Sequence, residues 1–449
     1  MMKNKQDLTR GPLAKQIFFF SVPLILSNLL QVLFNMADIA VVGRYAGPIA
    51  LGAVGSTAIL VSLFTGFLIG MAGGINVLAA LHFGARDRKA LAETVHSAAI
   101  LSAMVGVLFL LFGVLFAGPV LQLLKTKPEL IDGAALYLRI YFLGMPAMAI
   151  YNFGNAVFSA VGDTKRPLLY LSVAGALNVT LNLFFVIVCG LDVAGVALAS
   201  VISQYVSAGL ILLALFRRGR EGYGLRLREL RLSPSRSKAI LRIGVPGGLQ
   251  NATFAIANLF IQVGVNSFDA TMVAGNSAAT NSDPIAYDVM AAFYTACGSF
   301  IGQNYGARQK DRIKKSFLIS QAYSFGAGLV LGLGLWLLGP RFLALFTTEP
   351  AVIEAGMYRL QVMSLSYCVS SFMDCPIAAS RGLGRGLVPT VIVILGSCVF
   401  RIIWVYTVFA WFGTITSLYL LYPCSWTITA IAELWYFRRV YKEETAFME

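Results

Sequence analysis

Long apolar stretches without a single charged side chain recur along the whole chain, and they constrain its fold more than any other feature. Each is long enough to cross a bilayer as a helix, which needs about 20 residues. Only 12% of the 449 residues are charged, against roughly 25% in soluble domains, so a soluble globular enzyme is excluded. The clearest stretches cover residues 16–37, 94–124, 167–191, 193–216 and 316–340.

The apolar segments between polar residues predict an all-α integral membrane protein with twelve transmembrane helices. Little of the chain lies outside these segments, and it contains no GxxxxGK[ST] motif, so neither a nucleotide-binding domain nor ATP as the energy source is expected. The predicted spans are residues 16–42, 50–82, 92–116, 133–158, 168–188, 195–216, 240–265, 271–301, 316–338, 353–377, 388–410 and 415–437.

The positive residues are distributed asymmetrically between the two sets of loops that twelve spans create. One set, which includes both termini, holds 28 of the 35 Lys and Arg residues. Positive loops stay in the cytoplasm, so both termini are predicted to be cytoplasmic and the protein to be multi-pass in the cytoplasmic membrane. This distribution explains the net charge of +14 without a nucleic-acid partner.

The two halves of the sequence repeat each other at an offset of about 222 residues. Phe83-Gly84-Ala85-Arg86 returns as Tyr305-Gly306-Ala307-Arg308, and Gly118-Pro119 returns as Gly339-Pro340. Six spans per half is an even number, so the two copies have the same orientation in the membrane. The predicted domains are an N-terminal six-helix lobe at 1–216, a basic cytoplasmic linker at 217–238 and a C-terminal six-helix lobe at 239–449.

The first span carries a polar stripe that ends in a carboxylate. Gln31, Asn35 and Asp38 are spaced by four and three residues and share one helical face. The seventh span repeats the amides with Asn258 and Gln262, but Ile261 occupies the position that corresponds to Asp38. Interhelical hydrogen bonding is one explanation for the amides. A carboxylate within a span more often marks an ion or substrate path, so Asp38 is the predicted ion-coupling residue.

The fifth and sixth spans add oxygen-bearing side chains. Asn178 and Asn182 are four residues apart and share a helical face, and Ser200 offers a hydroxyl. One carboxylate with several neutral oxygens suits a hard monovalent cation. We therefore predict that Asp38, Asn178, Asn182 and Ser200 couple transport to H⁺ or Na⁺, with Na⁺ bound at the first three.

Acidic residues also lie within the predicted spans of the second half. Asp374 near the end of the tenth span is the strongest candidate, and its repeat partner is the polar Asn152. A salt bridge from Asp374 to Arg401 is the structural alternative. Asp283 and Asp288 are five residues apart, and one of them is expected to face a cavity. The residues assigned to the substrate path are Asp283, Asp374, Asn152 and the stripe amides Gln31, Asn35, Asn258 and Gln262.

The remaining distinctive residue types favour packing over chemistry. Gly66, Gly70 and Gly74 are spaced as GxxxGxxxG, which predicts close helix packing. The six cysteines show no CxxC spacing and the two histidines have no carboxylate cluster, so no cofactor and no enzymatic metal centre are expected.

Six motifs are spread over essentially the whole chain: NMADIAVVGR at 35–44, GARDRKA at 84–90, VGDTKRP at 161–167, NVTLNLFFV at 178–186, VAGVALASVIS at 193–203 and RGLGRGLVP at 381–389. As a set they resemble the multidrug and toxic compound extrusion (MATE) family. The resemblance implies two six-helix lobes in a V around a central cavity. It also implies a cation-coupling role for Asp38. This sequence differs from the family pattern at Asn182, where several relatives carry Asp.

The resulting hypothesis is an antiporter, not an enzyme, that acts as a monomer and expels amphipathic, mostly cationic organic compounds in exchange for H⁺ or Na⁺. The first alternative is a lipid-linked oligosaccharide flippase, which would need several cavity-lining basic residues for a pyrophosphate. The chain offers only Arg139, Arg359 and Arg401 within its spans. The second is a membrane enzyme acting on lipid, which the two isolated histidines disfavour.

Overall fold

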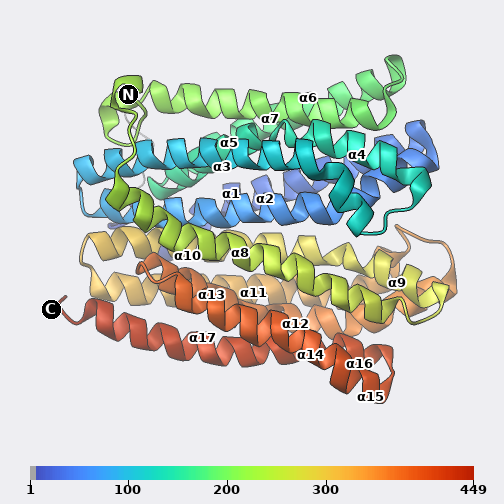
Figure 1. Cartoon of the computed structure of the whole chain (residues 1–449). Helices are drawn as coiled ribbons and strands as arrows, with labels where there is room; N and C mark the ends of the chain where they lie inside the picture. The colour runs from blue at the N-terminus through green and yellow to red at the C-terminus, as the bar shows by residue number, and fades with distance from the viewer. Residues whose placement is uncertain (1–6, 449) are drawn as a thin grey trace. The chain divides into compact units, whose positions relative to one another are not determined.

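The computed structural model describes residues 7–448, which form helices and short connections with no strand among them (Figure 1). The helices of the first half are α1 (Leu13–Val41), α2 (Gly47–Gly84), α3 (Arg88–Leu123), α4 (Pro128–Phe142), α5 (Met145–Ala160), α6 (Lys165–Leu183) and α7 (Asp192–Phe216). A π-helical turn, η1 (Val42–Ala46), joins α1 to α2, and a second, η2 (Phe184–Val188), extends α6.

The second half continues with α8 (Pro234–Val265), α9 (Ala270–Thr280), α10 (Ser282–Gly306), α11 (Lys310–Leu343) and α12 (Pro350–Gly382). The next helical stretch alternates between α and π geometry. It runs through α13 (Leu387–Val393), η5 (Ile394–Val399), α14 (Phe400–Trp404), η6 (Val405–Phe409) and α15 (Ala410–Phe412). Two further helices, α16 (Ile415–Tyr419) and α17 (Leu421–Thr445), end the chain.

Long apolar helices lie where the sequence predicts spans. Within residues 7–448, nine helical stretches are long and apolar enough to cross a membrane, or ten when α4 and α5, bent by 46°, count as one span. One of the nine covers Leu13–Gly84, which is 72 residues and contains both α1 and α2. Separating these two and adding the 32-residue α8, whose amides lower its hydropathy, gives the twelve expected segments.

The described chain forms two compact units whose limits differ from the predicted lobes. Unit 1 holds Leu26–Gly248, and unit 2 holds Leu8–Ile25 together with the residues from Leu249 onward. Each half therefore gives the first part of its first helix to the other unit. The predicted boundaries at 216 and 239 divide the chain by its sequence repeat, and a contiguous division of this kind cannot assign one helix to two units.

The first part of α1 packs within unit 2. Ile17 and Phe20 are buried in a cluster with Ala296 and Phe300 of α10, and the Phe20 and Phe300 rings meet edge to face at 5.5 Å. Before the helix begins, the Leu8 amide donates to Gln303 Oε1 at 3.2 Å. Apolar burial and this polar anchor together hold the start of α1 on α10.

The first part of α8 packs within unit 1 in the equivalent way, on α2. A Cβ added at Gly74 would lie 2.5 Å from the Gly244 nitrogen and 2.7 Å from its Cα. One added at Gly248 would lie 2.8 Å from the Phe67 carbonyl oxygen, and Gly70 faces the Gly247 backbone. Close packing at Gly70 and Gly74, predicted from their spacing, is confirmed: only glycine permits so close an approach.

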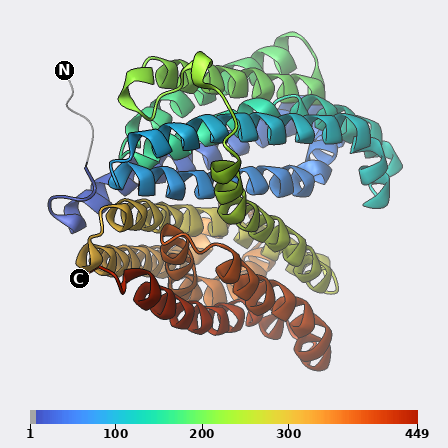
Figure 2. The same cartoon turned by 60° about the vertical axis from the view of Figure 1, so that its left-hand side comes forward.

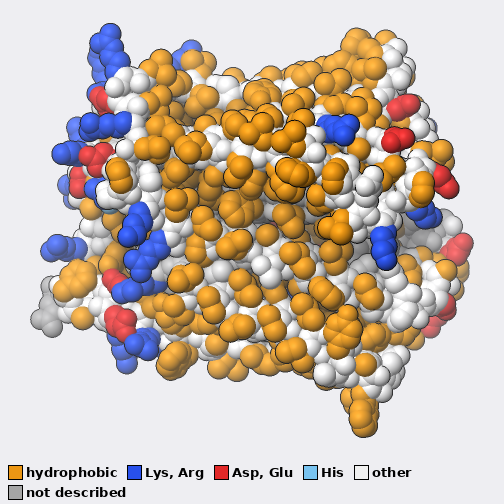
Figure 3. Space-filling view, in the orientation of Figure 1, with side chains coloured by type: hydrophobic (Ala, Val, Ile, Leu, Met, Phe, Trp, Pro, Cys, Tyr) orange, Lys and Arg blue, Asp and Glu red, His pale blue; other side chains and the backbone are white. Residues whose placement is uncertain are grey.

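The 217–238 segment is packed on unit 1 and leads into α8, which is seen as one long helix in both Figure 1 and Figure 2. It contains two 3₁₀ turns, η3 (Gly219–Glu221) and η4 (Leu227–Glu229). Tyr223 and Leu225 are buried in the core of the unit, and the Arg226 amide donates to His96 on α3 at 3.1 Å. On the face shown in Figure 3, the visible Lys and Arg side chains of each unit gather mainly toward one end of that unit.

Candidate cation site and buried polar clusters

Three helices of unit 1 bring the predicted coupling residues together. Asp38 lies in the last turn of α1, just before the π-helical turn η1. Asn178 and Asn182 lie one turn apart on α6, and Ser200 lies on the neighbouring α7. The predicted set of four is thus a single cluster inside one unit.

The four side chains form a closed ring of hydrogen bonds. Asn182 donates from Nδ2 to Asp38 Oδ1 and, at 3.3 Å, to Asn178 Oδ1. Asn178 in turn donates from Nδ2 to the Ser200 hydroxyl at 3.3 Å, and that hydroxyl donates to Asp38 Oδ2 at 3.4 Å. Each carboxylate oxygen of Asp38 therefore accepts one hydrogen bond from a neutral group.

The ring is shielded from solvent and contains an unused oxygen. Asn178 and Ser200 are each 7% exposed and Asn182 is 0% exposed. Asn182 Oδ1 is buried without a hydrogen-bond partner, and within residues 7–448 no Lys or Arg pairs with Asp38. A buried polar oxygen without a partner is uncommon. Two carboxylate oxygens, two amide oxygens and one hydroxyl are the donor types that Na⁺ or a proton would meet here.

Two tyrosines that the sequence analysis did not single out border this cluster. Tyr137 and Tyr141 are one turn apart on α4, and their rings stack with centroids 5.7 Å apart. Both lie close enough to Asp38 for its charge to act on them. Their spacing of four residues within a predicted span was the signal that could have identified them.

The predicted cavity residues of the first half lie outside the ring. Gln31 and Asn35 are exposed on α1, two turns and one turn before Asp38. Asn152 donates to the Met148 carbonyl at 2.9 Å, a bond within its own helix α5. Their assignment to a substrate path stays a prediction.

In the second half the polar stripe and Asp374 do not form a ring like that of Asp38. Asn258 is exposed on α8, and Gln262 donates to Asn266 at 2.8 Å, one turn further along the chain. Asp374 is half-buried on α12. The alternative salt bridge is not formed: among the described residues no ion pair joins Asp374 to Arg401, although the charge of Arg401 acts on it.

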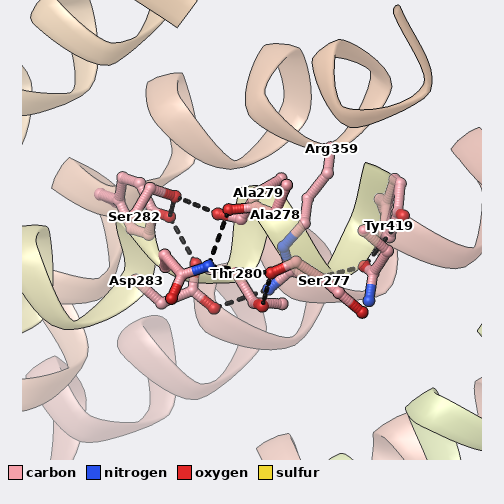
Figure 4. A network of polar contacts seen from close by, with 11 residues as sticks. Ser277, Ala278, Ala279, Thr280, Ser282, Asp283, Arg359 and Tyr419 are labelled. Carbon is pink, nitrogen blue, oxygen red and sulfur yellow. Dashed lines mark hydrogen bonds and ion pairs between the residues drawn. The ribbon is translucent and has the colours of Figure 1, made fainter. Parts of the chain in front are cut away.

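Asp283 belongs instead to a network between α9, α10, α12 and α16 (Figure 4). Arg359 Nη2 pairs with Asp283 Oδ2 at 2.6 Å, and the Tyr367 hydroxyl donates to Asp283 Oδ1 at 2.5 Å. Asn276 Oδ1 accepts from Arg359 at 3.3 Å and from the Tyr419 hydroxyl at 3.0 Å. The predicted cavity-facing carboxylate is thus the partner of a buried arginine. Asp288 lies half-buried on the same helix.

Glu433 is a buried carboxyl group that the sequence analysis overlooked. It is 0% exposed on α17, and neither carboxyl oxygen has a hydrogen-bond partner. The charges of Arg381 and Asp374 act on it. Arg381 itself donates to Gln250 at 2.6 Å and to Thr390 at 3.1 Å. The signal was present in the sequence, because Glu433 falls inside the last predicted span.

With the fold and these clusters described, comparison with known proteins identifies the family. The MatE family profile matches the chain twice, over residues 23–184 and 246–407. The chain belongs to the MatE family. The two matches correspond to the two halves of the internal repeat, so the duplication is confirmed as two copies of the family's own domain.

Curated relatives of this MatE protein match most of its length. The probable multidrug resistance protein YpnP of Bacillus subtilis is 29% identical over 80% of each chain. The multidrug export protein MepA of Staphylococcus aureus is 22% identical over 86% of each chain. Among solved structures, a MATE in complex with MaL6 is 23% identical, with a TM-score of 0.92 and coverage of 99% of this chain and 100% of the other. The structural likeness confirms the predicted all-α fold.

Proposed function

We propose that this MatE-family protein exports amphipathic, mostly cationic organic compounds across the cytoplasmic membrane, in exchange for H⁺ or Na⁺ that enters through the Asp38 cluster. The observation that carries the coupling mechanism is the closed ring of Asp38, Asn178, Asn182 and Ser200 around a carboxylate without a basic partner. The names of the relatives, multidrug resistance and multidrug export proteins, support organic compounds as the cargo.

A cation entering the ring must rearrange its hydrogen bonds. Both oxygens of ionised Asp38 accept from neutral donors, so a proton added to either oxygen introduces a donor and weakens that oxygen as the acceptor for Asn182 or Ser200. A Na⁺ ion needs oxygens, so the Asn182 amide must rotate to present Oδ1 in place of Nδ2. Either cation therefore changes how α1 is bonded to α6 and α7, which is the link that an antiporter requires.

We further propose that both termini are cytoplasmic and that one chain is the transport unit. Within unit 2, Arg312 donates to the Leu8 carbonyl at 3.0 Å and the Tyr441 hydroxyl donates to the Lys310 carbonyl at 3.3 Å. Leu8, before α1, and Tyr441, on α17, thus both contact the basic first turn of α11, in line with the positive-inside rule. All four residues of the proposed cation site come from a single chain.

Transport into proteoliposomes of the purified protein tests this function. The expected result is accumulation of rhodamine 123, a lipophilic cation, when a Na⁺ or an H⁺ gradient is imposed alone, with the active gradient identifying the ion. Empty liposomes provide the baseline. Absence of uptake under both gradients, with protein that elutes as a single species, would overturn the proposal and favour a flippase or a narrow-substrate exporter.

A further inference from the structure

Arg401 lies at an unusual position in the helix that follows α12. The five-residue α14 that carries it is flanked by two π-helical segments, η5 before it and η6 after it. Such π segments are rare and are often found at functional sites, because they change which side chains a helix turns inward. Here the side chain turned into the interior of unit 2 is a cation, which is 3% exposed.

The guanidinium of Arg401 is enclosed by aromatic rings instead of carboxylates. It lies over the rings of Tyr422 at 4.8 Å, Phe254 at 5.5 Å and Trp426 at 5.9 Å. Its Nε donates to the Ser425 hydroxyl at 3.2 Å. Its Nη2 is buried without a hydrogen-bond partner. The rings attract the positive charge, but they leave this nitrogen with unused donors.

The positive charge of Arg401 is balanced only indirectly, because the charge of Asp374 acts on it without forming an ion pair. The guanidinium of a second arginine, Arg359, also lies over the Tyr422 ring, 5.2 Å from its centroid. Arg359 has Asp283 as its ion-pair partner, at 2.6 Å. Within residues 7–448 no ion pair includes Arg401. Two cations thus share one ring, and only one of them is neutralised by a carboxylate in contact.

One wall of the cage belongs to the polar stripe of α8. Phe254 lies three residues after Asn251 and four before Asn258, so these three side chains share a helical face. Phe254 is partly exposed, whereas Tyr422 and Trp426 are buried. Phe254 therefore covers the side of the cage that is nearest to the surface, on the face where the predicted substrate-path residues Asn258 and Gln262 lie.

We propose that Arg401 is an oxyanion subsite that holds the carboxylate of a zwitterionic aromatic compound, whose ring system replaces Phe254 against the cage. The inference rests on the proposed export function and extends its substrates beyond simple cations. Arginine suits the role, because its planar fork can form two parallel hydrogen bonds with a carboxylate while a ring stacks on its face. A cation without a carboxyl group gains nothing from Nη2.

A pair of dyes that differ only in the carboxyl group tests the subsite. Rhodamine 110 has a free carboxylate, and rhodamine 123 is its methyl ester. Binding of both to the purified full-length protein in detergent is followed by fluorescence anisotropy. The wild-type protein is expected to bind rhodamine 110 at least as tightly as rhodamine 123. Arg401→Gln is expected to lower the ratio of the two affinities by at least tenfold.

Two further variants keep the result interpretable. Arg341→Gln removes the same charge from an exposed position on α11 and is expected to leave the ratio at the wild-type value. Arg401→Lys, which keeps the charge and loses the fork, is expected to give an intermediate ratio, and it serves if Arg401→Gln fails to fold. Gradient-driven uptake of rhodamine 123 into proteoliposomes tests the export function separately, so the two proposals can fail independently.

Three results would overturn the proposal. The first is a wild-type protein that binds rhodamine 123 but not rhodamine 110. The second is an unchanged ratio in both Arg401 variants. The third is that Arg401→Gln and Asp374→Asn each weaken the binding of both dyes to the same extent. That result would mean that Arg401 pairs with the Asp374 carboxylate in another state of the protein.

Discussion

Replacing Gly74 by alanine is expected to destabilise unit 1, because α2 and α8 touch there through their backbones. The added Cβ would lie 2.5 Å and 2.7 Å from the nitrogen and Cα of Gly244, and 3.2 Å from the Ile243 carbonyl carbon. Non-bonded carbon atoms prefer about 3.5–4.0 Å, so the two helices must separate by roughly 1 Å. No flexible side chain is available to move instead.

The expected cost follows from that separation. Overpacking of this kind costs about 1–3 kcal/mol, and neighbouring contacts weaken as the helices part. Alanine also has a helix propensity up to about 1 kcal/mol better than glycine, which acts in the opposite direction. Gly73→Ala is the matched control, since a Cβ at Gly73 meets no atom within 4 Å. The difference between the two variants isolates the packing cost.

Thermal unfolding in detergent, followed by the fraction that remains monodisperse, measures this difference. Gly74→Ala is expected to melt below Gly73→Ala by roughly 2–4 °C for each kcal/mol of packing cost, as for a domain of about 200 residues. Equal melting temperatures for the two variants would refute the backbone contact between α2 and α8, and with it the assignment of the first part of α8 to unit 1.

Two further predictions concern the polar clusters. Arg359→Met is expected to destabilise the protein by about 3–5 kcal/mol because it leaves Asp283 half-buried without its cation. Adding Asp283→Asn to Arg359→Met should recover part of the lost stability. Equal melting temperatures for Arg359→Met and for the double variant would contradict this coupling. Ser200→Ala removes the hydroxyl that donates to Asp38 at 3.4 Å and accepts from Asn178 at 3.3 Å. The binding free energy of the coupling cation is expected to fall by about 0.5–1.5 kcal/mol, or roughly 2- to 12-fold in affinity, as measured by titrating that cation in gradient-driven uptake. Unchanged cation dependence would place Ser200 outside the site.

Much of the fold was predictable because a bilayer restricts the options. Every span corresponds to a run of apolar residues, and the repeat defines which segments are equivalent. The spacing of four residues placed Asn178 and Asn182 on one face of α6, whereas Asp38 on α1 and Ser200 on α7 join them only through the packing of three helices. Spacing cannot reveal which helices are neighbours, so the stacking of Tyr137 and Tyr141 beside Asp38 was not foreseen.

What the sequence could not provide depends on contacts between distant segments. The exchange of the first parts of α1 and α8 between units rests on pairs such as Phe20 with Phe300 and Gly74 with Gly244. The partner of Asp283 is Arg359, which is 76 residues away. A salt bridge from Asp374 to Arg401 was a reasonable alternative because the two residues lie in consecutive spans. In the structure aromatic rings surround Arg401 instead.

The role of Asp38 in cation coupling is tested most directly by gradient-driven uptake of rhodamine 123 into proteoliposomes that carry Asp38→Asn. Asp132→Asn, which neutralises an exposed acid on α4, is the matched control. The account predicts that Asp132→Asn accumulates the dye as the wild-type protein does, while Asp38→Asn no longer responds to either gradient. Wild-type accumulation by Asp38→Asn under a Na⁺ or H⁺ gradient would contradict it.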